Sequence, residues 1–253
     1  MNNAKKRTQV VRFSPYFLAQ KIRKWHGLCA LCHEPITSYQ DNRSDLPILC
    51  SACHHLMRWH LPPILLQADL PAPMAGGHRQ IQPSFYLYCA TFYQYPINYA
   101  INRFKDHESL PSFMVLLHAI HQLPKPIGCH QHNTVIVPIP TTNKRLVRRG
   151  FDPVTMLTKA LSHHWGLPIW QGLCRVDDKI HQRGLDRQSR LSNIQDAFAM
   201  TDTPPVSQII LFDDVVTTGA TLKAAATTIW ACSLDIKVLA VCIAHGSAQF
   251  PHI

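Results

Sequence analysis

The sequence of 253 residues lacks any run of about eighteen consecutive apolar residues, so we expect no membrane-spanning helix. Its basic N-terminal stretch is not followed by the apolar core of a signal peptide. Acidic residues are also scarce, because 15 Asp and Glu stand against 25 Lys and Arg. The resulting formal net charge of +10 favours a polyanionic partner, whether a nucleic acid or a polyphosphate ligand.

The nine cysteines are an odd number, and four of them form two Cys-x-x-Cys pairs, which argues against a disulfide framework. A reducing cytoplasm with one metal site explains this usage better. Seventeen residues separate the two pairs, a spacing typical of a four-thiolate zinc site made by Cys29, Cys32, Cys50 and Cys53. Two alternatives remain: four unrelated thiols, or replacement of one thiolate by a neighbouring histidine from the set His26, His33, His54 and His55.

The stretch 209–221 carries the most specific structural signal in the sequence. Four apolar residues, 209–212, predict a buried parallel strand, which Asp213 and Asp214 end at the sheet edge where α/β proteins bind ligands. Because side chains alternate along a strand, at most one of the two carboxylates can point straight at a ligand. The following Thr-Thr-Gly-Ala-Thr turns into a helix and predicts a phosphate site of free N–H groups. The alternative for the acidic pair alone is a solvated turn.

We expect three regions: an N-terminal zinc module over 1–60, an irregular Pro-rich connection over 61–83, and an α/β domain over 84–253. Periodicity and turn residues predict strands at 85–93, 134–140, 169–175, 208–213 and 236–244, and helices at 16–25, 96–105, from Pro111, from Asp152 to Gly166 and after Thr221.

The segment 176–196 is rich in Lys, Arg, Gln and Asn and poor in large apolar residues. It predicts a mobile cationic flap over an anionic substrate, because lids come from segments with few buried contacts. The alternative is a solvated basic loop or helix.

The pattern at 209–221 resembles the ribose-phosphate signature of type I phosphoribosyltransferases. From Cys29 to about Ala244, the chain is similar to the ComF family of bacterial competence proteins. The residues that carry this similarity are the paired cysteines, Phe104-Lys105, Val137-Pro138-Ile139-Pro140, Arg149-Gly150-Phe151, Gln182, Leu185, Arg190, Asn193, Ala197-Phe198 and the 213–221 signature.

This resemblance implies an α/β fold, namely a type I phosphoribosyltransferase-like parallel sheet flanked by helices, with a small N-terminal four-cysteine zinc module. It implies a role in natural transformation and DNA uptake, with single-stranded DNA and a helicase-like partner. Relatives often carry a second set of metal-ligand cysteines, which this chain lacks around 71–77, so we expect one structural zinc.

The same resemblance implies a pocket for phosphoribosyl pyrophosphate with Mg²⁺. Asp213 and Asp214 would be the catalytic acids that hold the ribose hydroxyls. The loop residues Val216, Thr217, Thr218, Gly219, Ala220 and Thr221 would hold the 5′-phosphate. Lys144 and Arg145 would meet the pyrophosphate, and the further substrate-binding candidates are Lys105, Arg149, Gln182 and Arg190.

Three functions remain open from the sequence. The first is an active phosphoribosyltransferase with an unknown acceptor, in which the flap excludes water and electrostatic stabilisation of the leaving pyrophosphate dominates. The second is a module that binds a nucleotide or DNA phosphate without turnover, with a strongly salt-dependent affinity. The third is a zinc-stabilised adaptor for a protein partner. A competence factor with a retained phosphoribosyl-phosphate pocket is the leading hypothesis, and catalysis is left open.

Overall fold

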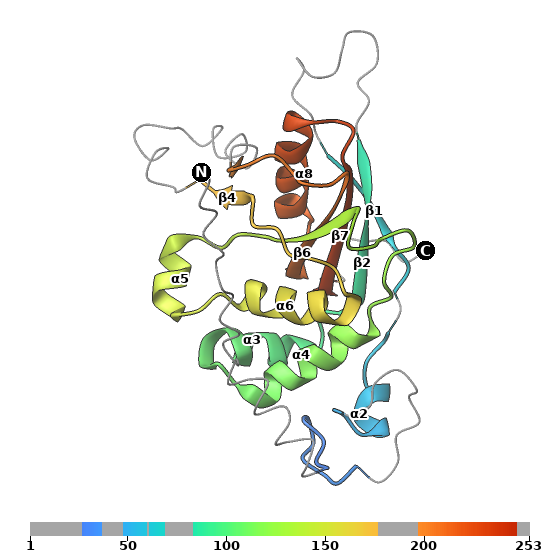
Figure 1. Cartoon of the computed structure of the whole chain (residues 1–253). Coiled ribbons are helices and arrows are strands. Elements are labelled where there is room, and N and C mark those ends of the chain that lie inside the picture. The colour runs from blue at the N-terminus through green and yellow to red at the C-terminus, as the bar shows by residue number, and fades with distance from the viewer. Residues whose placement is uncertain (1–26, 37–47, 60, 69–82, 177–196, 247–253) are drawn as a thin grey trace, which may run out of the picture.

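The computed structural model describes residues 27–36, 48–59, 61–68, 83–176 and 197–246 (Figure 1). A five-stranded sheet runs through these residues in the order β1-β2-β7-β6-β3. Its strands are β1 (Ile64–Gln67), β2 (Ser84–Phe92), β3 (Thr134–Pro138), β6 (Gln208–Val216) and β7 (Lys237–His245). Strands β2, β7, β6 and β3 are parallel, and β1 pairs antiparallel with β2 at the edge. The expected α/β architecture is confirmed.

Helices cover both faces of this sheet (Figure 1). One face carries α3 (Ile97–His107), α4 (Leu110–Gln122) and α6 (Pro153–Trp165). The other face carries α8 (Ala220–Cys232) and the hairpin of β4 (Leu173–Arg175) and β5 (Phe198–Met200). Strands between two helical layers are buried on both sides, which explains why β6 begins with an unbroken apolar run whose residues 209–212 are fully buried.

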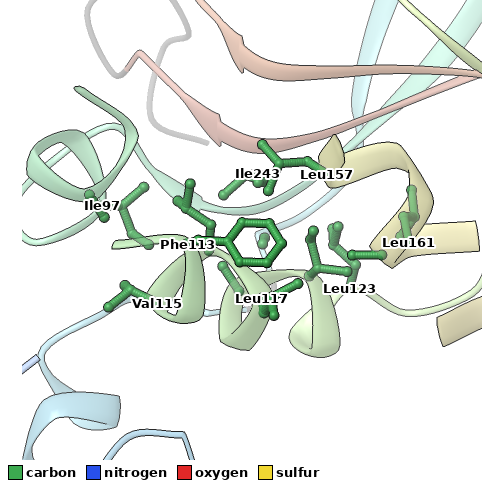
Figure 2. Close-up of a cluster of buried hydrophobic side chains, with 14 of the residues drawn as sticks. Ile97, Phe113, Val115, Leu117, Leu123, Leu157, Leu161 and Ile243 are labelled. Atoms are coloured by element: carbon green, nitrogen blue, oxygen red, sulfur yellow. The ribbon is translucent and has the colours of Figure 1, made fainter. Parts of the chain in front are cut away.

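The core under α4 and α6 is made of large aliphatic and aromatic side chains (Figure 2). Phe113 and Leu117 of α4 lie in the same buried cluster as Leu157 and Leu161 of α6 and Ile243 of β7. Each of these five side chains is at most 6% exposed. Full burial of such a side chain contributes about 1.5–3 kcal/mol, so this layer holds the helices firmly on the sheet.

Local capping signals fix the helix ends where the sequence predicts them. The Asp152 side chain accepts hydrogen bonds from the N–H groups of Val154 and Thr155, and Pro153 occupies the first turn of α6. Gly166 ends that helix with a φ of 65°, in the left-handed region that glycine adopts without steric cost. Every described helix has 13 residues or fewer, too short to cross a bilayer, and none qualifies as a membrane span.

Four local expectations are corrected. Strand β6 does not end at the acidic pair but continues to Val216. Within 169–175, Ile169 makes only an isolated parallel bridge to Ile136 of β3, and the last three residues form a strand that pairs with β5 and not with the main sheet. The connection expected to be irregular contains β1, and the strand expected over 134–140 ends at Pro138 and is followed by a short helix, α5 (Asn143–Arg149). The helix expected at 16–25 and the segment 177–196 lie outside the described residues.

Candidate functional site

The loop after β6 forms a small cavity of about 40 Å³, lined by Asp213 and residues 215–222. Gly219 has a φ of 75° and begins α8, so the loop turns sharply into the helix. The Ala220 N–H donates to the Thr218 Oγ1 atom at 3.3 Å. Within the described part of the chain, the N–H groups of Thr218, Gly219 and Thr221 have no hydrogen-bond acceptor. These donors stand at the positive end of the α8 dipole and can bind an anion.

Two features of the backbone favour glycine at position 219. Its positive φ is costly for any residue with a Cβ atom. A Cβ built there would also lie 3.2 Å from two methyl carbons of Leu66, which belongs to β1. Strand β1 therefore packs directly behind the loop and defines how closely the backbone turns.

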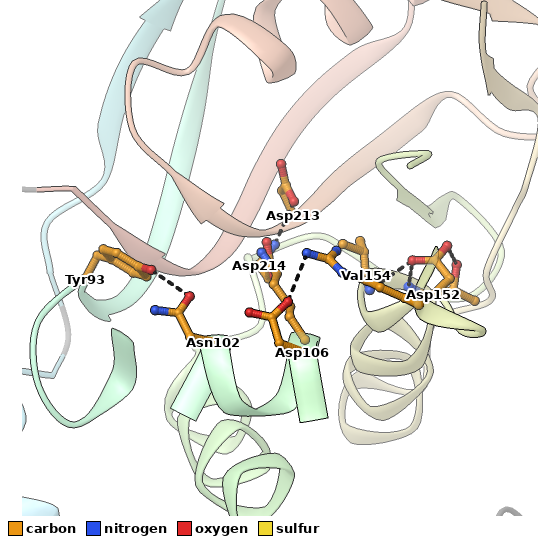
Figure 3. A network of polar contacts seen from close by, with 10 residues as sticks. Tyr93, Asn102, Asp106, Asp152, Val154, Asp213 and Asp214 are labelled. Atoms are coloured by element: carbon orange, nitrogen blue, oxygen red, sulfur yellow. Dashed lines mark hydrogen bonds and ion pairs between the residues drawn. The ribbon is translucent and has the colours of Figure 1, made fainter. Parts of the chain in front are cut away.

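Asp213 and Asp214 occupy different environments, as the alternation of side chains along β6 requires. Asp213 is half-buried and lines the cavity, and its Oδ1 atom accepts the Asp214 N–H at 2.9 Å (Figure 3). Asp214 is only 3% exposed, and its Oδ2 atom lies 2.5 Å from the Lys105 Nζ atom of α3. The expectation that at most one carboxylate can face a ligand is consistent with this arrangement.

Burial raises the pKa of the Asp213 carboxyl well above its usual value, and the nearby Asp214 carboxylate raises it further. The Asp214 N–H and the Lys105 ammonium act in the opposite direction but do not cancel the effect. Near neutral pH, this site therefore favours a cation or a hydrogen-bond donor at Asp213, because either would stabilise the charged carboxylate.

The remaining substrate-binding candidates divide into four groups. Lys105 lies in the site. Arg149 lies at the end of α5, and its Nη2 atom is 3.7 Å from the Asp106 Oδ1 atom of α3 (Figure 3). Lys144 and Arg145 are exposed on α5, with no ion pair among the described residues. The last two candidates, Gln182 and Arg190, lie outside the described residues.

Helix α5 nevertheless starts at the edge of the sheet where Asp213 and Asp214 lie. It follows the carboxyl end of β3, which pairs in parallel with β6, so α5 and the acidic pair share one sheet edge. A larger cavity of about 600 Å³ lies near the opposite end of β3, where His132, His163 and Leu167 are among its lining residues. None of the candidate ligand residues lines that larger cavity.

The four paired cysteines come together as expected. Their sulfur atoms all lie within 4.8 Å of one another, and the Cys32 and Cys50 sulfurs are 3.7 Å apart. Sulfurs about 2.3 Å from a tetrahedral zinc ion would be about 3.8 Å apart, so the spacing fits a metal ion of this kind. The neighbouring His33, His54 and His55 are not part of this cluster, which is the only group of potential metal ligands among the described residues.

Backbone N–H groups prepare one of these thiols to bind a metal as a thiolate. Burial of Cys29 opposes ionisation, but the N–H groups of Cys32, Cys50 and Leu31 lower its pKa to about 7. The Leu31 N–H lies 3.5 Å from the Cys29 sulfur. Such N–H contacts are the chemistry that a thiolate needs when it ligates a metal.

The segment that carries Cys50 and Cys53 packs on α4 through a group of rings that sequence reasoning missed. His54 lies in the short helix α2 (Ser51–His55), and its Nδ1 atom is 2.8 Å from the Nε2 atom of buried His118. Trp59 stacks on His54, with ring centroids 5.3 Å apart, and its Nε1–H donates to the His54 carbonyl. Cys29 and Cys53 also belong to the buried cluster under α4. Nothing in the sequence signals this contact, because His118 reads as one polar residue in an apolar helix.

A scan against protein-family models finds no match. Among curated proteins, the chain is 26% identical over 213 residues to Competence protein F of Haemophilus influenzae, covering 78% of this chain and 82% of that protein. It is also 26% identical to the DNA utilization protein YhgH of Salmonella typhimurium over 206 residues, and to YhgH of Escherichia coli K12 over 208 residues. Each of these two alignments covers 78% of this chain and 87% of the relative.

Proposed function

We propose that this chain, which belongs to the ComF family of competence proteins, acts in DNA utilization through a pocket for a ribose phosphate at the β6–α8 loop. The names of the relatives support a competence or DNA-utilization role. The finer assignment is ours: a function in natural transformation, with single-stranded DNA as a ligand and a helicase-like protein as a partner.

The proposed pocket is supported by three features that occur together at one sheet edge. N–H groups without an acceptor among the described residues lie at the start of α8, a half-buried carboxylate lines the cavity, and a glycine with positive φ shapes the loop. The loop would hold a phosphate by its N–H groups and the hydroxyls of Thr217 and Thr218. Asp213 would accept hydrogen bonds from the ribose hydroxyls or hold Mg²⁺, which prefers oxygen ligands.

Phosphoribosyl pyrophosphate with Mg²⁺ fits this set of groups. Bound Mg²⁺ would neutralise charge on the pyrophosphate, and the exposed Lys144 and Arg145 would approach that same group from α5. We rank ligand binding without turnover as the first candidate, because none of the described side chains is assigned to an acceptor base. Turnover as a phosphoribosyltransferase is the second candidate, favoured by the presence of a carboxylate and cations on one edge.

We further propose that the four-cysteine cluster holds a structural zinc ion. The sulfur spacing fits zinc, and a module this small has little apolar core of its own, so metal binding would supply folding free energy. Cys32 is exposed and Cys50 partly buried, so a metal bound by this cluster would lie near the protein surface, and none of the four cysteines lines the β6–α8 pocket. Metal-bound thiolates persist in a reducing compartment, which supports a cytoplasmic location.

The role in DNA uptake is tested in the host by replacing the chromosomal copy with variants. Asp213→Asn and Gly219→Val should lower the frequency of transformation by donor DNA, while Lys159→Gln, an exposed change on α6, should leave it at the wild-type level. Comparable protein levels must be confirmed by immunoblot. Wild-type transformation in both pocket variants would reject the pocket, and wild-type transformation in a strain lacking the chain would reject the role.

Turnover is tested separately with purified protein. The chain is incubated with Mg²⁺ and labelled phosphoribosyl pyrophosphate, with and without single-stranded DNA. Release of pyrophosphate with a defined acceptor would identify a transferase, whereas binding without release would identify a binding module.

A further inference from the structure

We infer that Lys105 is the fixed counter-charge of Asp214, and that Asp213 is therefore the single carboxylate that the site offers to a bound sugar phosphate. This inference rests on the proposed ribose-phosphate pocket. It changes the role of Lys105 from a ligand contact to a positioning residue, and it makes the two neighbouring acids unequal.

The position of Lys105 is set by the core and not by the ligand. Its neighbour Phe104 is fully buried in the last turns of α3. The Phe104 ring centroid lies 5.1 Å from that of Phe113 and 5.4 Å from that of Phe151, which follows α5. With Phe104 held from two sides, the next side chain leaves α3 in a defined direction, toward β6.

The ion pair that results is well shielded. The Lys105 side chain is 22% exposed and that of Asp214 is 5% exposed, and their charged atoms are 2.5 Å apart. In the described part of the chain, no other cation forms an ion pair with Asp214. Removing one partner of a buried ion pair is strongly destabilising, so Lys105 is the counter-charge that the buried Asp214 side chain requires.

Asp213, unlike the buried Asp214, is partly exposed. It lines the cavity, whereas Asp214 does not, and one of its oxygens is occupied by the Asp214 N–H. The Asp213 Oδ2 atom therefore remains for a ligand. With Lys105 in place, the Asp214 side chain has a cation beside it, and without Lys105 it would stand uncompensated near an anionic phosphate.

The test is a set of three full-length variants: Lys105→Met, Asp214→Asn and the double variant. Affinity for ribose 5-phosphate is measured by calorimetry. We expect Lys105→Met to weaken binding about tenfold or more, because an uncompensated carboxylate repels the phosphate. The double variant should recover to within about threefold of the wild type, since the repelling charge is gone. Failure of the double variant to recover would show that Lys105 contacts the ligand, and would overturn the inference.

A second readout needs no ligand. The Asp213 carboxyl carbon is followed by NMR as pH changes, in surroundings that include Asp214, Lys105 and the Cys242 thiol of β7. Lys105→Met should move the Asp213 midpoint upward, and adding Asp214→Asn should bring it down again. Lys159→Met, which removes an exposed charge on α6, is the matched control and should leave the midpoint unchanged.

The two readouts separate the claims. If the wild type does not bind ribose 5-phosphate, the proposed pocket fails, while the Asp213 titration still decides the role of Lys105. If the Asp213 midpoint is the same in wild type and Lys105→Met, the counter-charge role is wrong whatever the binding data show.

Discussion

Replacement of Asp213 by Asn should stabilise the protein near neutral pH. Burial raises the pKa of this carboxyl, Asp214 adds to the effect, and Lys105 only partly offsets it. The folded state therefore binds a proton more tightly than the unfolded chain does, and stability falls as pH rises from the unfolded pKa of about 3.9 toward the raised folded pKa. Each unit of elevation corresponds to about 1.4 kcal/mol lost above that window.

Asn is nearly the same shape and can still accept the Asp214 N–H through its amide oxygen. We therefore expect Asp213→Asn to raise the free energy of unfolding by about 1 kcal/mol or more at neutral pH, with little gain at about pH 4. The assay is urea unfolding between about pH 4 and pH 8, with the difference from wild type plotted against pH.

The control is Asp235→Asn, which removes an exposed carboxylate just before β7 and should leave the pH dependence of wild type unchanged. A destabilised Asp213→Asn variant, or one with a pH-independent difference from wild type, would refute the reasoning. Destabilisation would mean that the charged carboxylate is favoured in the folded protein, and a pH-independent difference would mean that folding does not shift the Asp213 pKa.

Other predictions concern the metal module, the loop and the basic segment. Wild-type protein purified without chelators should contain one zinc per chain by elemental analysis, and Cys50→Ser should lose it and become sensitive to protease in the module. Gly219→Val should cost about 1–2 kcal/mol and abolish sugar-phosphate binding, whereas an unaffected variant would argue against a required left-handed turn. His118→Ala should speed proteolysis near Trp59 without unfolding the sheet domain, as tested by digestion and circular dichroism. Hydrogen exchange in 176–196 should slow when phosphoribosyl pyrophosphate or single-stranded DNA is added, and the exchange rate should recover with salt. Equal exchange with and without both ligands would contradict the hypothesis that this segment is a flap.

The β6–α8 region could be predicted because its signals are local. An apolar run, two acids, a glycine loop and a helical repeat follow one another along a short stretch of chain, and each specifies its own backbone conformation. Residues 222, 225, 226, 229 and 230 all turn out to be buried on α8, as their spacing predicts. The cysteine cluster was predictable for the same reason, since each Cys-x-x-Cys pair forms a tight local turn that brings its two sulfurs together.

Contacts between distant segments could not be predicted in this way. The Lys105–Asp214 pair joins α3 to β6, and no pattern within either segment specifies the partner. The same holds for the His54–His118 contact. Strand β1 was missed because four residues among prolines carry too little alternation, and they become a strand only by pairing with β2. Tertiary pairing determines these features, and a single sequence does not encode it locally.

The central claim is that the β6–α8 loop binds a ribose phosphate, and calorimetric titration of the full chain with phosphoribosyl pyrophosphate and Mg²⁺ tests it most directly. We expect one binding site per chain, with heat that disappears in Gly219→Val and persists in Lys159→Gln, which lies on the exposed side of α6. Absence of binding heat with folded, zinc-loaded wild-type protein, or equal heat in Gly219→Val, would contradict the claim.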